Sequence, residues 1–288
     1  MLSLPKILIL AVIQGVSELL PVSSSAHVIV AEKLMGLDPT SPPMTLLLVM
    51  LHTGTMLAVI VFFWSSWKAN FFSSPKVILE SVKLIVIATI ATGLVGLLLK
   101  KIIEKVFLKG FSHPEIELLF GNLLIISAAL AVVGALILCT GLKKDDSLKL
   151  KTPLGLMTAC LIGLVQGICL PFRGFSRSGA TISTGLILGI EKKSVEDFSF
   201  ALAVVLTPPV ILMEVLRFLK AEHASGHQAM HAIGLFLPSL VGMVLSFVAG
   251  FLALKWLSNW LENGRWYFFG FYCLLASAVI LFLHGQGL

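Results

Sequence analysis

Charged residues are scarce in this chain of 288 residues: only 12% are Asp, Glu, Lys or Arg, whereas 57% are hydrophobic. A soluble domain carries about 25% charged residues, and a chain this apolar could not cover its hydrophobic surface in water. The mean hydropathy is +1.00. The composition therefore excludes an ordinary soluble protein and predicts one whose solvent is a lipid bilayer.

Paired cysteines are also missing. None of the four cysteines belongs to a CxxC pair, so the sequence indicates neither a zinc site nor a disulfide framework. The formal charge of +6 does not indicate a nucleic-acid partner, because Lys and Arg fall mainly in short connections between apolar runs, as membrane proteins require. In those connections they attract the anionic head groups of membrane lipids.

Six apolar stretches are long enough to cross a bilayer, which takes about 20 mostly apolar residues. Lys, Arg or Trp flank their ends, as is usual at the membrane surface. The predicted spans are residues 44–64, 77–99, 118–140, 198–219, 231–254 and 266–284.

Two further hydrophobic regions are interrupted by polar residues. Residues 5–35 are broken between Glu18 and His27, and residues 152–190 are broken between Pro171 and Gly179. Each arm is too short to cross the membrane comfortably, so each region is interpreted as a re-entrant helical hairpin. Non-helical backbone at that depth is tolerated only inside protein or beside water.

The same order of elements occurs twice. Residues 1–140 and 152–288 each give one hairpin followed by three spans, and the charged linker 141–151 separates these halves. Gln-Gly recurs at 14–15 and 166–167. The predicted fold class is an all-α polytopic membrane protein, a single membrane domain built as an inverted-topology repeat, which often places a site where the interrupted segments meet.

The orientation follows from the loops. If the hairpins open to opposite faces, the loops 65–76, 141–151, 191–197 and 255–265 share one side and carry a small excess of Lys and Arg. The positive-inside rule makes that side cytoplasmic and leaves both termini outside.

The first interruption, residues 14–27, is named the acidic motif. It offers Glu18 and His27 as titratable groups. The imidazole can transfer a proton or attack phosphorus. Glu18 can orient that His, hold a divalent cation or act as a base. The hydroxyls of Ser23, Ser24 and Ser25 are possible nucleophiles.

The second interruption, residues 171–181, is named the arginine motif. Arg173 and Arg177 supply forked, positively charged donors that suit phosphate, and a helix beginning near Ser178 would add its N-terminal N–H groups. An Arg at a helix centre in the membrane costs about 2.5–3.5 kcal/mol, so these residues need a partner or a function. A phosphate clamp facing an acid–base pair is typical of phosphoryl transfer.

Simpler interpretations remain for single side chains. A serine in a membrane helix commonly bonds the carbonyl four residues earlier, and an Arg near a helix end can extend to the interface. The second alternative applies to Arg173. His52, alone in an apolar span, is interpreted as a packing or interface residue.

With these motifs the chain resembles the undecaprenyl-diphosphate phosphatase family, the bacitracin-resistance type, over essentially its whole length. The family signature E/Q-x-x-x-E leading into P-V-S-S-x-x-H is matched by residues 14–27. The signature P-G-x-S-R-S-x-x-T is matched from Gly174 to Thr181, with Pro171 three residues before Gly174 instead of adjacent to it. Position 14 is Gln where some members have Glu, so a metal would find one carboxylate fewer.

The resemblance implies a membrane hydrolase that converts undecaprenyl diphosphate to undecaprenyl phosphate and inorganic phosphate. This activity recycles the lipid carrier for peptidoglycan and cell-wall synthesis, confers bacitracin resistance and requires a divalent cation, Mg²⁺ or Ca²⁺. The substrate is a polyprenyl diphosphate lipid. The expected location is the outer side of the bacterial cytoplasmic (inner) membrane, and the sequence leaves a homodimer open.

Roles carried over by the resemblance fall into three groups. Glu18 and Gln14 are the expected metal-binding residues. Glu18, Ser24, His27 and Arg177 are the expected catalytic residues, and the sequence does not decide between Ser24 and His27 as the nucleophile. The expected phosphate-binding residues are Ser23, Arg173, Ser176, Arg177, Ser178 and Thr181.

The main alternative is a transporter or flippase for a lipid-linked phosphate or another anion, since inverted repeats with re-entrant segments are also transporter architecture. Glu18 and His27 favour hydrolysis, because anion transport has less need of an acid and a proton shuttle. A purely structural membrane protein is disfavoured by two arginines in one broken helix.

Overall fold

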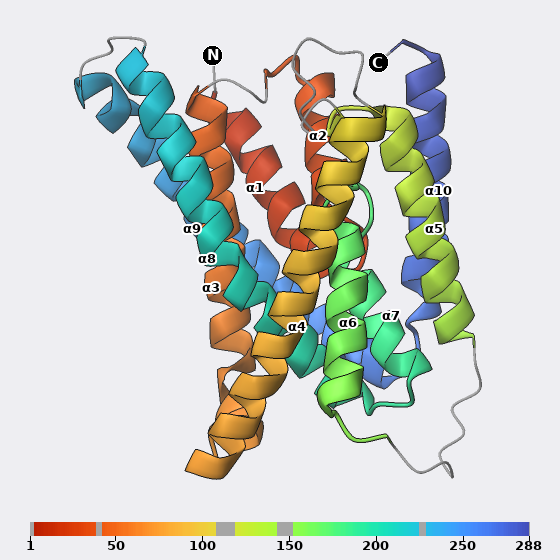
Figure 1. Ribbon diagram of the computed structural model, residues 1–288. Helices are drawn as coiled ribbons and strands as arrows, with labels where there is room; N and C mark the ends of the chain where they lie inside the picture. The colour runs from red at the N-terminus through yellow and green to blue at the C-terminus, as the bar shows by residue number, and fades with distance from the viewer. Residues whose placement is uncertain (1–2, 39–41, 108–118, 143–151, 225–228, 288) are drawn as a thin grey trace. The chain divides into compact units, whose positions relative to one another are not determined.

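The computed structural model describes residues 3–38, 42–107, 119–142, 152–224 and 229–287 (Figure 1). Within these ranges the regular elements are all helices, and six of them are long and apolar enough to cross a membrane. The all-α class and the six predicted spans are therefore confirmed. Most of the predicted charged linker, residues 143–151, lies outside the described ranges.

The long helices coincide with the predicted spans. Polar side chains begin two of them: Ser74 Oγ accepts the N–H of Val77 at 3.4 Å, and Asn122 Oδ1 accepts two first-turn N–H groups. The long helices are α3 (Pro42–Asn70), α4 (Pro75–Ile102, continued by the π-helix Ile103–Phe107), α5 (Leu123–Gly141), α8 (Lys192–Ala224), α9 (Ala229–Glu262) and α10 (Tyr267–Gly285).

Four short helices occupy the two interrupted regions. They are α1 (Leu4–Leu19) with α2 (Ser24–Leu34), and α6 (Leu156–Cys169) with α7 (Arg177–Ile187). At 1.5 Å per residue, the 16 residues of α1 span about 24 Å and the 14 residues of α6 about 21 Å, less than the hydrocarbon thickness of about 30 Å. Two short helices followed by three long ones thus occur twice; membrane re-entry and the inverted repeat stay predictions.

The chain forms two compact units, and each unit takes residues from both halves of the sequence. Unit 1 contains Met1–Leu20, Ser24–Phe63 and Ala203–Leu257. Unit 2 contains Pro21–Ser23, Trp64–Leu202 and Ser258–Leu288. The division of the sequence into halves at the linker stays a prediction.

In unit 1, helix α1 packs closely on α9. A Cβ on Gly15 would lie 2.6 Å from Ala249 Cβ and 2.8 Å from Ser246 O, so only a glycine allows this approach. Beside it, α1 contributes Ile7 and Leu10 to a buried cluster that also contains Val28 of α2.

In unit 2, helix α6 packs on α4 in the same manner. A Cβ on Gly163 would lie 2.3 Å from Ala88 O, and one on Gly167 would lie 2.7 Å from Thr92 O. Helices α5 and α10 lie side by side (Figure 1), joined by Ser127 and Ser277, which each donate a hydroxyl to the other's carbonyl. Small residues that let backbones approach are typical of helix contacts in membranes.

The first turns of α8 are also anchored within unit 2. Asp197 is fully buried and accepts Ser66 Oγ at 2.5 Å and Asn70 Nδ2 at 3.0 Å, while Trp67 Nε1 donates to its carbonyl at 3.1 Å. The buried neighbour Glu196 accepts the hydroxyl of Ser258 in α9. These buried carboxylates fasten the end of α3 and the end of α9 to α8.

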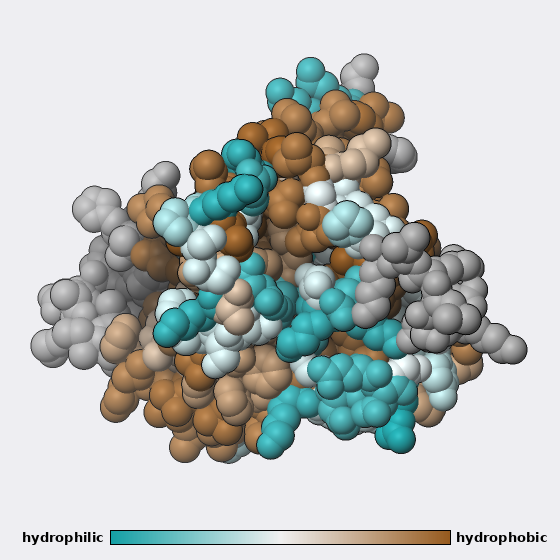
Figure 2. All heavy atoms as spheres, turned by 90° about the horizontal axis from the view of Figure 1, so that it is seen from below, coloured by the Kyte–Doolittle hydropathy of each residue, from teal (hydrophilic) through white to brown (hydrophobic). Residues whose placement is uncertain are grey.

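The outer surface has the distribution of a membrane protein. Leu94, Leu97 and Leu98 on α4 are more than half exposed, which suits a lipid-facing helix. Figure 2 looks onto one end of the molecule, where hydrophilic side chains gather, while hydrophobic ones cover the flanks.

We expect Gly163→Ala to lower the melting temperature of the purified protein in detergent. The new methyl group would meet the Ala88 carbonyl, and overpacking of this kind costs about 1–3 kcal/mol. Gly93 of α4 has open space around its Cβ position, so Gly93→Ala is the matched control and should melt at the same temperature or higher, since Ala is the better helix former. Equal melting temperatures for the two variants would contradict the close α4–α6 contact.

Candidate active site

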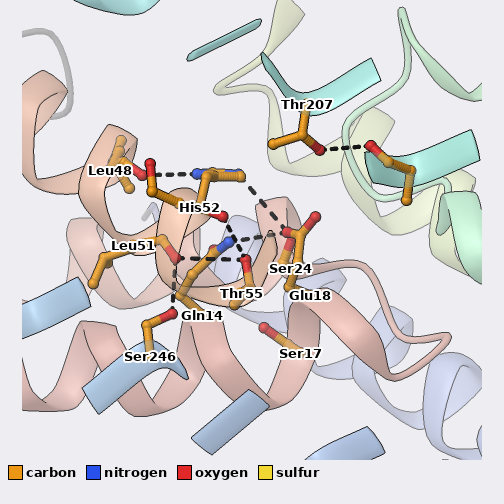
Figure 3. A network of polar contacts seen from close by, with 12 residues as sticks. Gln14, Ser17, Glu18, Ser24, Leu48, Leu51, His52, Thr55, Thr207 and Ser246 are labelled. Atoms are coloured by element: carbon orange, nitrogen blue, oxygen red, sulfur yellow. Dashed lines mark hydrogen bonds and ion pairs between the residues drawn. The ribbon is translucent and has the colours of Figure 1, made fainter. Parts of the chain in front are cut away.

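The acidic motif lies at the end of α1 and the start of α2, in unit 1. Gln14 and Glu18 are four residues apart and therefore share a face of α1. Gln14 Nε2 donates to Glu18 Oε2 at 2.9 Å, and the hydroxyl of Ser24 donates to the same oxygen. Figure 3 shows these side chains converging on the Glu18 carboxylate. Ser24 is thus held where a carboxylate can accept its proton.

His52 of α3 is a third neighbour of this oxygen. Its Nε2 lies 3.7 Å from Glu18 Oε2, and its Nδ1 lies 2.8 Å from the carbonyl of Leu48 (Figure 3). The sequence pattern did not predict this contact of His52 with Glu18. The one signal available was the polar stretch His52-Thr53-Gly54-Thr55 within an apolar helix.

Helix α3 is held firmly at this point. Ser246 of α9 donates to the carbonyl of Leu51 at 2.9 Å, and Thr55 donates to the carbonyl of His52 at 2.9 Å. A Cβ on Gly54 would lie 2.2 Å from Met243 O, so α3 and α9 touch backbone to backbone. The ring of His52 therefore projects from a well-packed segment.

The remaining residues of the acidic motif differ in their surroundings. Ser17 donates its hydroxyl to the carbonyl of Ile13, the simple intrahelical bond that membrane serines often make. His27 is half-buried in α2, three residues after Ser24, so these two share a helix face. Ser23 is buried and has φ 66°, a left-handed backbone that is uncommon outside glycine.

The segment Pro21–Ser23 belongs to unit 2, where it meets the arginine motif. The carbonyl of Pro21 lies 3.3 Å from Cys273 Sγ and 3.2 Å from where a Cβ on Gly179 would be. Gly179 is in the first turn of α7. The structure thus brings the turn containing Ser23 against the helix that begins at Arg177.

The arginine motif forms the turn between α6 and α7. Gly174 has φ 101°, and a Cβ there would lie 2.4 Å from Ile126 O. Ser176 is the N-cap residue of α7, since its Oγ accepts the N–H of Gly179 at 3.2 Å. Arg177 is the first residue of the helix, one position before the expected start, so its side chain lies at a helix N-terminus where anions are favoured.

The polar side chains of the arginine motif separate into two groups. Ser176 and Ser178 are buried with their hydroxyl oxygens 3.4 Å apart, beside Arg177. Thr181 is fully buried, bonds the carbonyl of Arg177 at 2.8 Å and meets Ser199 Oγ of α8 at 2.6 Å. The guanidinium of Arg173 lies 4.3 Å from the centre of the Phe120 ring, a cation–π contact. Thr181 and Arg173 therefore have structural partners within unit 2.

Glu18 and Gln14, the expected metal-binding residues, carry one negative charge between them. Among the described residues no group of three or more His, Cys, Asp or Glu side chains is placed to hold a metal ion. Glu18 supplies one carboxylate, with the Gln14 amide beside it. This donor set fits a cation such as Mg²⁺, which is commonly held by one or two carboxylates together with phosphate oxygens of the substrate.

Comparison with known proteins extends over nearly the whole chain. The family model described as bacitracin resistance protein BacA matches residues 7–279. The chain is 57% identical over 279 residues to undecaprenyl-diphosphatase 2 of Acinetobacter baylyi, covering 96% of each sequence. It is 34% identical over 280 residues to the undecaprenyl-diphosphatase of Caldicellulosiruptor bescii (94% of each sequence) and 30% identical over 288 residues to that of Parabacteroides distasonis (95% and 96%).

We expect Gly174→Ala to destabilise the protein more than Gly264→Ala. Both glycines have positive φ, which costs an alanine about 1–2 kcal/mol, but only Gly174 would also press a methyl group against a backbone carbonyl. Thermal unfolding of the two purified variants in the same detergent measures the difference. If the melting temperatures of both variants fall by the same amount, the turn before Ser176 does not pack against α5.

Proposed function

Because the chain belongs to the bacitracin resistance protein BacA family, we propose that it is an enzyme that hydrolyses undecaprenyl diphosphate to undecaprenyl phosphate and inorganic phosphate. This reaction recycles the lipid carrier for cell-wall synthesis and confers bacitracin resistance. The observation that carries the catalytic assignment is the hydrogen bond from Ser24 Oγ to the Glu18 carboxylate.

This hydrogen bond supports Ser24 as the nucleophile and Glu18 as its base. Glu18 takes the hydroxyl proton while Ser24 Oγ forms a bond to the terminal phosphorus and the bridging P–O bond breaks, releasing undecaprenyl phosphate. Water then attacks the phosphorylated serine and yields inorganic phosphate. His27, on the same face of α2 as Ser24, is suited to give a proton to the leaving oxygen.

The arginine motif is suited to hold the phosphate. Arg177 offers a forked, permanently charged donor at the first turn of α7, and Ser176 and Ser178 add hydroxyls beside it. The turn of Pro21–Ser23 packs against Gly179, and Ser24 follows Ser23 in the chain. We propose that both motifs act on the same diphosphate. Ser23, Arg173 and Thr181 contribute through the shape of the turn and of α7.

Glu18 and Gln14 would hold a divalent cation, Mg²⁺ or Ca²⁺. When bound, the cation neutralises negative charge on the diphosphate. Gln14 keeps the Glu18 carboxylate turned toward Ser24 through its amide hydrogen bond.

The six apolar helices and the lipid substrate support a membrane location. A multi-pass protein lets the isoprenoid tail remain in lipid while its diphosphate reaches the polar residues at the two turns. We place the enzyme in the bacterial cytoplasmic membrane, with the active site open to the outer side.

Arg177→Ala should abolish phosphate release while the protein still inserts and folds, because the phosphate charge is left without its partner. Loss of a preorganised oxyanion donor costs about 10²–10³ in turnover, and Arg177→Lys should recover only part of it, since Lys lacks the fork. The assay is phosphate release from undecaprenyl diphosphate by detergent-solubilised protein with Mg²⁺ or Ca²⁺, and then with EDTA. Arg265→Ala, at an exposed position, is the control. Wild-type turnover in Arg177→Ala would remove Arg177 from the site.

Glu18→Gln and His27→Ala should each lower turnover at least about a hundredfold, as expected for positioned acid–base groups. Ser24→Ala should do the same if its hydroxyl is the nucleophile. Ser17→Ala is the matched control, because the Ser17 hydroxyl bonds its own helix, and it should retain turnover. Mild losses in all three variants would place the chemistry elsewhere. Folded wild-type protein that releases no phosphate at all would favour the transport alternative.

A further inference from the structure

The Nε2 nitrogen of His52 faces Glu18. The carbonyl of Leu48, 2.8 Å from Nδ1, can only accept a hydrogen bond, so Nδ1 carries the proton. In a neutral imidazole Nε2 is then the nitrogen with the free lone pair. This nitrogen faces Glu18 Oε2 at 3.7 Å.

A lone pair and a carboxylate oxygen at this separation do not bond each other directly. A hydrogen bond from nitrogen to oxygen spans about 2.7–3.2 Å, and both atoms here are acceptors. Two ligands of one cation, each about 2.0–2.2 Å from the metal, stand about 2.8–3.8 Å apart at angles of 90–120°. The observed separation falls within this range, at its upper end.

The support of the ring is also that of a metal ligand. A metal-bound His generally donates its other ring N–H to a carboxylate, carbonyl or water, which fixes both tautomer and orientation. The Leu48 carbonyl fulfils that role, and α3 is packed against α9 through Gly54 and Ser246. The side chain is about one third exposed, which leaves access for an ion.

We propose that His52 Nε2 and Glu18 Oε2 are two ligands of the same divalent cation, and that this site prefers a first-row transition ion over Ca²⁺. The inference rests on the proposed function only for the presence of a cation. Because position 14 is an amide, Glu18 is the one charged ligand of the acidic motif. The imidazole nitrogen of His52 would add a further ligand to the side-chain oxygens of Glu18 and Gln14. Imidazole suits first-row ions such as Fe²⁺, Ni²⁺ and Zn²⁺, whereas Ca²⁺ takes oxygen ligands; Mn²⁺, the weakest binder of that series, serves as the paramagnetic probe.

The test is Mn²⁺ binding to the purified full chain with a histidine-free affinity tag, in detergent and without substrate. Loss of the free Mn²⁺ signal in electron paramagnetic resonance gives the affinity, and pulsed spectra report a bound imidazole nitrogen. We expect the wild type to show nitrogen coupling, and His52→Gln to lose it and to bind Mn²⁺ at least about tenfold more weakly. Ca²⁺ affinity, measured by competition, should change less.

Two histidine variants serve as controls. His284 is exposed at the end of α10, so His284→Gln should keep the nitrogen coupling and the Mn²⁺ affinity of the wild type. His27→Gln should keep the coupling as well, because His52 is the proposed source. Retention of the coupling in His52→Gln, its loss in His27→Gln or its absence from the wild type would each overturn the proposal.

This outcome is separable from that of the proposed function. Binding is measured without turnover, so coupling from His52 in a protein that releases no phosphate would support the cation site and contradict hydrolysis. A matching melting temperature of His52→Gln and the wild type without metal establishes that the variant is folded. Gln is close to His in size and keeps a polar group at the position.

Discussion

The cost of placing charge in a hydrophobic environment is the constraint on which the polar parts of this protein depend. Glu18 sits in a mostly apolar helix, and a single oxygen of its carboxylate faces Gln14, Ser24 and His52. These partners come from three helices, α1, α2 and α3. A carboxylate with so many polar partners fixes how these helices pack.

Close helix contacts make such partners available. Gly15 lets α1 touch α9, and Gly167 lets α6 touch α4. In each pair a short helix from one half of the sequence packs on a long helix from the other half, as expected if the halves are repeats. The polar groups are not repeated: four residues after Gln14 stands Glu18, whereas four residues after Gln166 stands Leu170. The first half of the sequence thus carries the acid, and the second half carries the two arginines of the arginine motif.

The apolar composition and the polar interruptions made much of the fold predictable. Long apolar runs flanked by Lys, Arg and Trp identified the six spans, because length and hydropathy alone decide whether a helix can cross a bilayer. The polar interruptions located both turns: α1 ends at Leu19, two residues before Pro21, and α6 ends at Cys169, two residues before Pro171. The start of α7 was predicted within one residue, since a helix was expected near Ser178 and begins at Arg177.

Contacts over long sequence separations could not be predicted. His52 is 34 positions from Glu18, and in a span it looks like any packing residue until α3 is placed beside α1. Thr181 matches a phosphate-binding signature, yet its hydroxyl bonds Ser199 and a helix carbonyl. Arg173 has the charge expected of a phosphate-binding residue, yet its guanidinium lies over the Phe120 ring. Residue type indicated what each could do, and only packing revealed which partner it has.

The chemistry of an amphiphilic substrate explains why an enzyme would accept buried carboxylates and arginines. A diphosphate attached to a long isoprenoid cannot leave the membrane, so the residues that hydrolyse it must lie within reach of the bilayer. Water is sparse there, and a hydroxyl nucleophile activated by a fixed carboxylate does not need water for the first step. Arg177 is the first residue of α7, where the helix N-terminus favours an anion. Under the proposed mechanism the two half-buried groups differ in role: the carboxylate of Glu18 would accept a proton, whereas the guanidinium of Arg177 would hold the phosphate through charge-assisted hydrogen bonds.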